Sequence, residues 1–162
     1  MLQKKEDADW NRIRTEPRPA NQDVFAHGIG QLRMQLIVCP SFEEPVAWEI
    51  RQGSDGWKLY RPKVLHPWPN VQLVGYDATP FPSERLASFF HSVTSITMPI
   101  TPDLTGNIGL DGTIFQIAIH GDMFSSWSFQ WWSEPPNQWS SLSNIVSEML
   151  MAFASTVSLM RS

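Results

Sequence analysis

Apolar and polar side chains alternate over four stretches of the first half of the chain, which is the period of a strand with one buried face. The clearest stretch covers residues 32–38, where leucine, methionine and valine alternate with arginine and glutamine. Residues 46–51, 57–61 and 71–74 predict three further strands. Between the second and third, Gly53-Ser-Asp-Gly56 has the composition of a hairpin turn.

A helical period replaces this alternation at two places. The apolar face of the first predicted helix consists of Leu86, Phe89, Phe90 and Val93. We expect Pro82 at its first helical position, and Pro99 and Pro102 to end the element. The second predicted helix, of about four to five turns, is N-capped by Ser140 or Ser141. Its apolar face consists of Leu142, Ile145, Val146, Met149, Leu150, Phe153 and Val157.

A hairpin is expected between the two helices. Residues 111–119 form its first strand, residues 120–122 the turn, and residues 124–132 the returning strand, before Pro135-Pro136 stops the sheet. Strands joined by hairpins, with helices segregated from them, predict an α+β fold. We expect a two-layer sandwich in which two main helices cover one face of a mostly antiparallel sheet.

The first residues differ in character from the rest. Residues 1–23 mix charges with prolines and lack a clear period, which predicts a loosely ordered N-terminal arm. Residues 24–162 are then expected to form one α+β domain, since this length can bury a sizeable core.

Four of the eight tryptophans lie within residues 127–139. Because side chains alternate along a strand, one set of aromatic residues should pack under the helices: Trp127, Phe129 and Trp131. Trp132 instead shares the opposite face with Gln130 and, across the hairpin, with His120. A large aromatic ring on such a face is either a protein contact or is covered by a loop, the N-terminal arm or a second copy. Trp139 is expected in the core.

Charge is distributed unevenly along the chain. No Lys or Arg occurs between Ala87 and Met160, where the only formal charges are Asp103, Asp111, Asp122, Glu134 and Glu148. The net charge of −4 comes entirely from residues 86–162. An acidic surface repels phosphate backbones, so we expect no nucleic-acid partner. It suits a basic protein partner.

A small basic group surrounds the second hairpin. Its members are Arg51, Lys58, Arg61 and Lys63. On an outward face these side chains would bind an anion or protect a solvated strand edge.

Catalytic and metal-binding signatures are weak. Cys39 is the only cysteine, and His27, His66, His91 and His120 have no spacing that selects one of them as its partner. A lone cysteine at a strand end is typically a small buried hydrophobe. No histidine pair, calcium loop or phosphate-binding glycine loop is present, so we expect no metal and no cofactor.

Targeting signals are also missing from the sequence. The charged N-terminus is not followed by an apolar segment, and no apolar run is long enough for a membrane span. We expect a cytoplasmic protein with no membrane partner.

The segment from Leu110 to Leu142 contains Leu110-Asp-Gly-Thr, then Ser128-Phe-Gln-Trp-Trp132, then Pro136-Asn-Gln-Trp139 before a helix. This order resembles short bacterial proteins, some of which are similar to the immunity proteins encoded beside secreted polymorphic toxins. The resemblance covers about a quarter of the chain. It implies a hairpin followed by a terminal helix, and it carries no catalytic residues.

Three functions from different classes remain open. The first is a cytoplasmic, non-catalytic binding protein that neutralises a protein partner by occlusion, as toxin immunity proteins do. Its expected contacts are Trp132, Glu134, Asp111, Asp122, Gln130 and His120. The second is a small-ligand or carbohydrate-binding module that uses Trp68, Trp132 or Tyr60 as a stacking platform. The third is an enzyme that uses Cys39 or a histidine. The sequence leaves the oligomeric state open.

Overall fold

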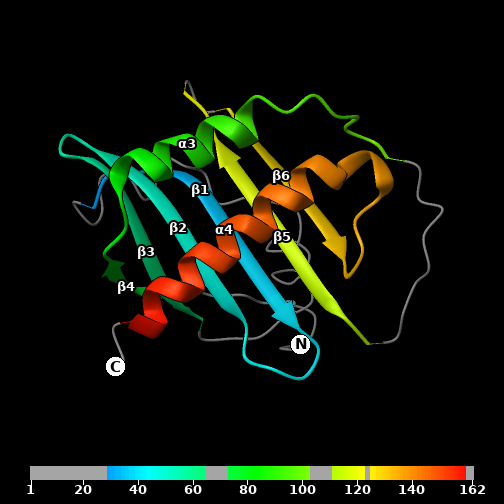
Figure 1. Cartoon of the computed structure of the whole chain (residues 1–162), viewed down its shortest axis with the longest axis horizontal. Coiled ribbons are helices and arrows are strands. Elements are labelled where there is room, and N and C mark those ends of the chain that lie inside the picture. Colours follow the sequence, from blue (N-terminus) through cyan, green and yellow to red (C-terminus); the bar gives the residue numbers. More distant parts are fainter. Residues whose placement is uncertain (1–28, 65–72, 103–110, 123–124, 160–162) are drawn as a thin grey trace, which may run out of the picture.

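The computed structural model describes residues 29–64, 73–102, 111–122 and 125–159 (Figure 1). The expected N-terminal arm of residues 1–23 and the start of the expected domain therefore lie outside the described residues. The elements in chain order are β1 (Gln31–Pro40), β2 (Val46–Gly53), β3 (Gly56–Val64), β4 (Leu73–Thr79), α3 (Ser83–Thr94), β5 (Thr113–His120), β6 (Ser126–Trp132), the 3-10 turn η1 (Asn137–Trp139) and α4 (Ser140–Leu159).

The six strands form one antiparallel sheet in the order β4-β3-β2-β1-β5-β6. Helices α3 and α4 lie across the same face of this sheet (Figure 1). The α+β, two-layer prediction is therefore confirmed. β1 is central: it pairs with β2 on one side and with β5 on the other, so it joins the N-terminal meander to the C-terminal hairpin.

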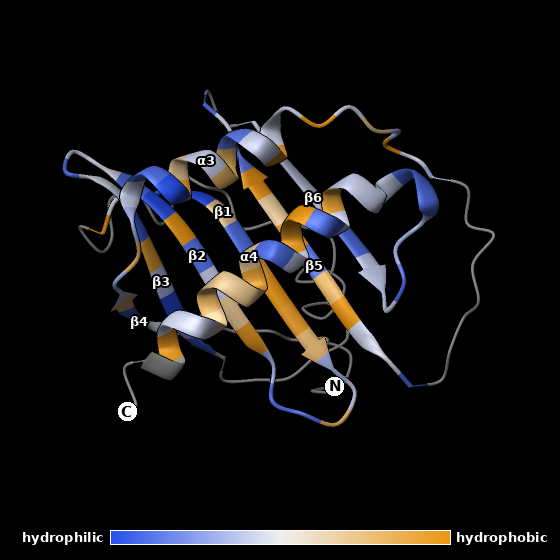
Figure 2. Ribbon diagram, viewed as in Figure 1, coloured by the Kyte–Doolittle hydropathy of each residue, from blue (hydrophilic) through white to orange (hydrophobic). Residues whose placement is uncertain are grey.

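The main core lies between the helices and the sheet, where apolar stretches of the strands run beneath α3 and α4 (Figure 2). The helices contribute Leu86, Phe89, Val93, Leu142, Val146, Met149 and Phe153. The sheet contributes Met34, Leu36, Trp48, Ile50, Leu59, Ile117, Ile119 and Trp131. The Phe153 ring joins both layers, since it packs against Trp48 (5.3 Å between ring centroids) and against Phe89 (6.0 Å). The predicted core positions of both helices are thus largely confirmed.

Trp139 lies in the core, as predicted. Its Nε1 donates a hydrogen bond to the Pro99 carbonyl (2.9 Å), and its ring packs edge-on against Phe129. Because Pro99 follows α3 and Phe129 belongs to β6, Trp139 joins the helix layer to the last strand.

Trp127 was expected to pack under the helices, and that prediction is wrong, because this residue is 53% exposed. Alternation places Trp127 on the helix face, but it lies near the start of an edge strand.

Several element boundaries differ from the sequence prediction, among them three near α3. Pro82 is the N-cap of α3 rather than its first helical residue. Helix α3 ends at Thr94, before either proline, because the Ser95 amide and the Thr94 hydroxyl both bond to the last carbonyls of the helix. The fourth strand continues to Thr79, beyond the expected residues 71–74, of which 71 and 72 lie outside the described residues.

The face of the sheet that points away from the helices is also largely buried. Glu49 and Arg51 on this face are both 0% exposed and form an ion pair (Arg51 Nη2 to Glu49 Oε2, 2.7 Å). Gln35 Nε2 donates to the other oxygen of Glu49 (3.0 Å), and Arg51 Nη1 donates to the Gly30 carbonyl (3.1 Å). The prediction that Arg51 belongs to an outward basic group is therefore wrong, because a carboxylate on the same strand partners it inside the protein.

The other basic residues of that group do not share one surface. Lys58 is exposed and donates to Asp55 in the β2–β3 turn, and this hydrogen bond lowers the pKa of the Asp55 carboxyl. Arg61 lies on the helix face, where its guanidinium is 5.5 Å from the centre of the Trp48 ring. The expected anion-binding or edge-protecting group is thus divided between two faces of the sheet.

We expect the buried ion pair to make single substitutions costly. Replacing Arg51 alone with leucine leaves a buried carboxylate without its cation, which should lower the free energy of unfolding by about 3–5 kcal/mol. Adding Glu49→Leu removes that uncompensated charge, so the double variant should be more stable than Arg51→Leu. Urea unfolding of the wild type, both single variants and the double variant measures this coupling. If the free energy of unfolding of the double variant falls by the sum of the two single decreases, the pairing is contradicted.

Candidate protein-binding surface

Three segments distant in sequence meet where β1 ends and β5 begins. The Ser41 amide and hydroxyl both donate to the Gly112 carbonyl (2.9 and 2.7 Å), and the Gly112 amide donates to Ser41 Oγ (3.0 Å). On the other side of β5, the Ser133 amide donates to the Thr113 carbonyl (2.7 Å), and the Thr113 amide donates to Ser133 Oγ (3.1 Å). These bonds hold the β1–β2 loop, residues 111–112 and the end of β6 together.

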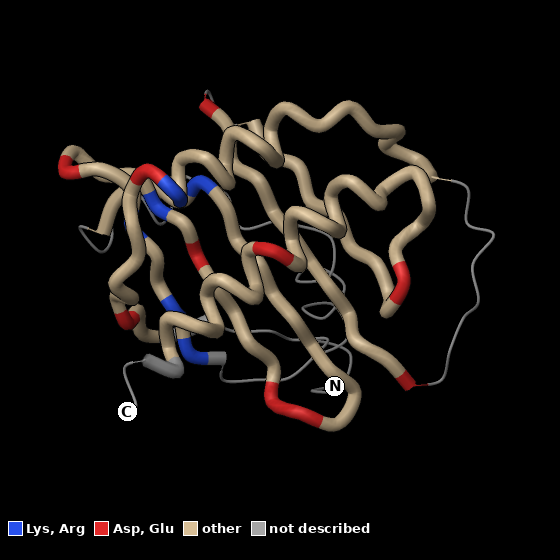
Figure 3. Tube along the Cα trace, viewed as in Figure 1, with Lys and Arg blue, Asp and Glu red and all other residues tan. Residues whose placement is uncertain are grey.

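This junction carries exposed acidic side chains from all three segments. Glu43 and Glu44 come from the β1–β2 loop, Asp111 precedes β5, and Glu134 follows β6. Phe42, between Ser41 and Glu43, is 84% exposed. We call these five residues the acidic end of the sheet. Figure 3 shows the three acidic segments at the same end of the molecule.

Basic residues lie elsewhere in the described part of the chain. No Lys or Arg occurs in the β1–β2 loop, at residues 111–112 or at residues 133–136. Lys63 reaches the same end of the sheet, but on β3, two strands from β1. The acidic end therefore presents four carboxylates without an intervening cation on its own segments.

The structure places the predicted contact Trp132 beside the acidic end but does not leave it open. Trp132 is half-buried and packs against a small apolar cluster behind the sheet, formed by Ile37, Cys39, Ala47 and Ile114. Its direct partner across the hairpin is Ile114. The ring thus packs on an apolar patch instead of standing free on its face of the strand. It supports the exposed residues that follow it.

The other predicted contacts are divided between the two ends of β5. Asp111 and Glu134 belong to the acidic end, and Gln130 is exposed on β6, opposite Gln116. Asp122 lies beyond the far end of β5, where Arg33 Nη1 donates to its carboxylate (2.6 Å). Its neighbour His120 is 2% exposed, so its side chain is not offered to a partner. The predicted set is therefore spread along the β5–β6 hairpin. Asp111 and Glu134 lie at one end, Asp122 and His120 lie about 25–35 Å from them, and Gln130 lies between.

Sequence reasoning missed Phe42, Glu43 and Glu44. The signal was present in Ser41-Phe-Glu-Glu-Pro45, where an apolar ring and two acidic residues stand in a short connection between two strands. A large apolar side chain in a polar turn is unusual enough to suggest a contact. The link to the acidic second half of the chain was not visible, because it depends on the pairing of β1 with β5.

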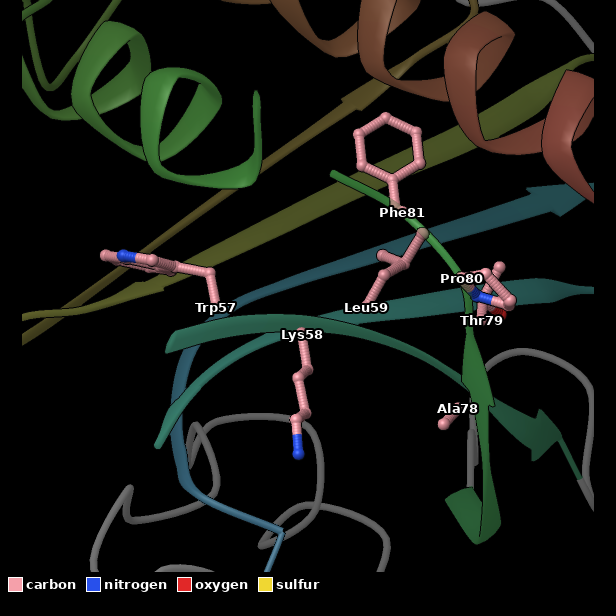
Figure 4. Close-up of a pocket in the computed structure, with 7 residues that line it drawn as sticks. All are labelled: Trp57, Lys58, Leu59, Ala78, Thr79, Pro80 and Phe81. Carbon is pink, nitrogen blue, oxygen red and sulfur yellow. The ribbon is translucent and has the colours of Figure 1, made fainter. Parts of the chain in front are cut away.

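A separate hollow is formed by β3, the end of β4 and the connection from β4 to α3 (Figure 4). Its volume is about 260 Å³, and its lining consists of Trp57, Lys58, Leu59, Ala78, Thr79, Pro80 and Phe81. Lys58 points away from the Trp57 and Phe81 rings (Figure 4). Ligand pockets are typically about 300–1,000 Å³ with convergent polar groups. Two of the stacking platforms predicted for a small-ligand site, Trp132 and Tyr60, do not line the hollow, and Tyr60 is buried. The third, Trp68, lies outside the described residues.

Cys39 occupies a buried position on β1, as the sequence predicted. Burial raises the pKa of the Cys39 thiol. His120 lies six residues along β5 from Ile114, the residue opposite Cys39, which is about 20 Å. His91 lies on α3, across the sheet, and His27 and His66 fall outside the described residues. The described histidines therefore give Cys39 no general base.

The described ranges contain no group of three His, Cys, Asp or Glu side chains that could hold a metal ion. None of their helices has the length and apolar character needed to cross a membrane. Comparisons with protein-family models, with curated proteins and with solved structures found no match to the chain.

We expect Gly112→Ala to disturb the acidic end. A β-carbon at Gly112 would lie 2.5 Å from Trp132 Nε1 and even closer to Ser133 Oγ. Overpacking of this kind should lower the free energy of unfolding by about 1–3 kcal/mol. In a Ser133→Gly background, which lacks the closest atom, the same substitution should cost less. An equal cost in both backgrounds, measured by urea unfolding, would show that the contact is not the cause.

Cys39 should be chemically inert in the folded protein. Because its pKa is raised, iodoacetamide at neutral pH should label it only after unfolding in urea, as measured by mass spectrometry. The folded state favours the neutral thiol, so its contribution to stability is complete below the ordinary pKa of 9.0 and is lost as pH rises above it. A Cys39→Ala variant should lose less stability over that alkaline range. Rapid labelling of the native protein would contradict this account.

Proposed function

We propose that the protein is a cytoplasmic, non-catalytic binding protein that neutralises a basic protein partner by covering its active-site cleft, as immunity proteins do for bacterial toxins. The observation that supports this function is the acidic end, where three separate segments place four exposed carboxylates at the same end of the sheet as an exposed phenylalanine. The resemblance of residues 110–142 to immunity-like proteins agrees with it.

Charge has two effects in such a complex. Four carboxylates on one end attract a basic cleft over about 8–10 Å at physiological salt, which raises the association rate. The net charge of −4 adds to this attraction. Complementary charge also excludes partners of the same sign. Steering therefore supplies the speed and part of the specificity that an inhibitor needs.

Phe42 supplies the short-range contact. Phe42 is 84% exposed, so its truncation should cost the free protein little stability. When a partner covers the ring, most of its apolar area becomes buried. Interface anchors are typically aromatic rings surrounded by polar residues, and Phe42 is followed directly by Glu43 and Glu44. Trp132 and the hydrogen bonds at Gly112 hold the loop and the strand ends beneath this surface.

We expect substitutions at the acidic end to weaken binding without unfolding the protein. The tagged chain is first used to capture partners from its native cell extract, and the captured protein is purified for kinetic measurement. Glu43→Lys with Glu44→Lys should lower the association rate by about tenfold. Phe42→Ala should raise the dissociation rate by about tenfold or more. Surface plasmon resonance separates the two rates.

A control is Glu148→Lys, which reverses one charge at an exposed position of α4, as each of the two acidic-end substitutions does on its own. It should leave both rates nearly unchanged. The wild-type association rate should fall with added salt, and the partner's activity should be inhibited by one equivalent of the protein. The proposed function would be overturned if neither the acidic-end substitutions nor added salt changed the rates. It would also be overturned if the partner stayed active when bound.

A further inference from the structure

β6 forms an edge of the sheet whose own residues carry none of the usual protection. Among the described residues it pairs with β5 alone, over seven consecutive residue pairs without a bulge. Residues 126–132 include no charged residue and no proline, although unpaired edges are normally blunted by such residues. The strand is rich in aromatic residues, which favour strand pairing.

The free edge presents backbone hydrogen-bonding groups. At the two ends of the β5–β6 ladder, the Gly121 amide donates to the Ser125 carbonyl (2.8 Å) and the Ser133 amide donates to the Thr113 carbonyl (2.7 Å). In an antiparallel pair such bonded residues recur at every second position. The odd-numbered residues of β6 therefore bond to β5, and the even-numbered ones direct their N–H and C=O groups outward: Ser126, Ser128, Gln130 and Trp132. The first three are exposed.

The opposite edge of the sheet differs. β4 contains Gly75 in the left-handed region (φ 63°) and the charged Asp77, and its pairing with β3 is interrupted between Pro62 and Lys63. Each of these features hinders the addition of a further strand. Of the two edges, β6 is therefore the one suited to pairing with a further strand.

We infer that β6 is a self-association edge, on which β6 of a second copy of this chain adds in antiparallel orientation about a two-fold axis at Phe129. This register places Ser128 opposite Gln130 of the second copy and Ser126 opposite its Trp132, so that the outward groups of both strands meet. On the helix face Trp127 lies opposite Trp131 of the second copy. Aromatic pairs of this kind stabilise adjacent strands.

Charge favours a second copy over a basic partner at this edge. The strand itself is neutral, so it offers nothing to attract cations, and two identical strands do not repel each other. The antiparallel joint places the acidic ends of the two copies at opposite ends of the strand pair. Glu134 of one copy then approaches the Asp122 end of the other, where Arg33 already pairs with that carboxylate.

Exposed apolar groups flank the strand on its helix side. Trp127 is 53% exposed, and Ile100 is 77% exposed. Ile100 follows Pro99, whose carbonyl bonds to Trp139, and Trp139 packs on Phe129 of β6. Both exposed side chains therefore belong to the margin of the sheet that a second copy would cover, which adds apolar burial to the backbone hydrogen bonds.

Sedimentation equilibrium of the full chain tests the inference. The wild type should form a dimer of twice the 18.5 kDa chain mass at about 100 µM. Ser128→Pro removes one outward amide that the monomer does not use, and Ser128→Lys adds an edge charge; each should weaken the dimer by roughly tenfold or more. Ser147→Lys, at an exposed position of α4, should leave it intact. Thermal unfolding confirms that the variants fold.

Disulfide cross-linking tests the register. Residues opposite each other in a bonded antiparallel pair have α-carbons about 5.5 Å apart, within the range of a disulfide. The double variant Ser128→Cys with Gln130→Cys should therefore form a covalent dimer on oxidation, whereas Ser126→Cys with Gln130→Cys should form much less. A monomeric wild type, a dimer indifferent to both Ser128 substitutions, or open-ended polymers would each overturn the inference. If the monomer instead loses its captured partner on Ser128→Pro, the edge belongs to a partner's strand and the second-copy assignment is wrong.

Discussion

The pairing of β1 with both β2 and β5 is the constraint on which the rest of the structure depends. A strand bonded on both sides has its backbone groups satisfied along its length, and it fixes the register of each neighbour. Through β1, the meander of β1 to β4 and the hairpin of β5 and β6 become one sheet whose helix-facing side is shared by both parts. The same pairing brings Ser41 to Gly112, and thereby creates the acidic end.

The two faces of the sheet are stabilised differently. The helix side is a continuous apolar and aromatic core centred on rings such as Phe153 and Trp48. The other side combines a small apolar cluster with the buried pair of Glu49 and Arg51. A buried ion pair adds little net stability over apolar packing, but its breakage is costly. The pair itself lies within β2, and the bonds from Gln35 of β1 to Glu49 and from Arg51 to the Gly30 carbonyl link it to the neighbouring chain segment.

The two surfaces to which we assign roles use interactions of different range. The acidic end acts through charge that extends beyond molecular contact, and it suits a partner that must be found quickly among many proteins. The β6 edge acts through directional hydrogen bonds, which form only when a second strand is in register. The acidic end lies where the strands terminate and the edge lies along one strand, so the two surfaces adjoin at Glu134, which follows β6.

Local periodicity determined most of the elements. Alternation identified the strands and the 3.6-residue period identified α3, α4 and the residues they bury, because these patterns depend only on which neighbours share a face. The predicted boundaries were wrong where capping bonds decide them, as at Thr94. Tertiary structure alone decided that Arg51 is buried, that Trp127 is exposed and that Trp132 is half-buried. The candidate surface also required it, since Glu43, Glu44 and Asp111 become neighbours only through strand pairing across some 70 residues, which no local pattern encodes.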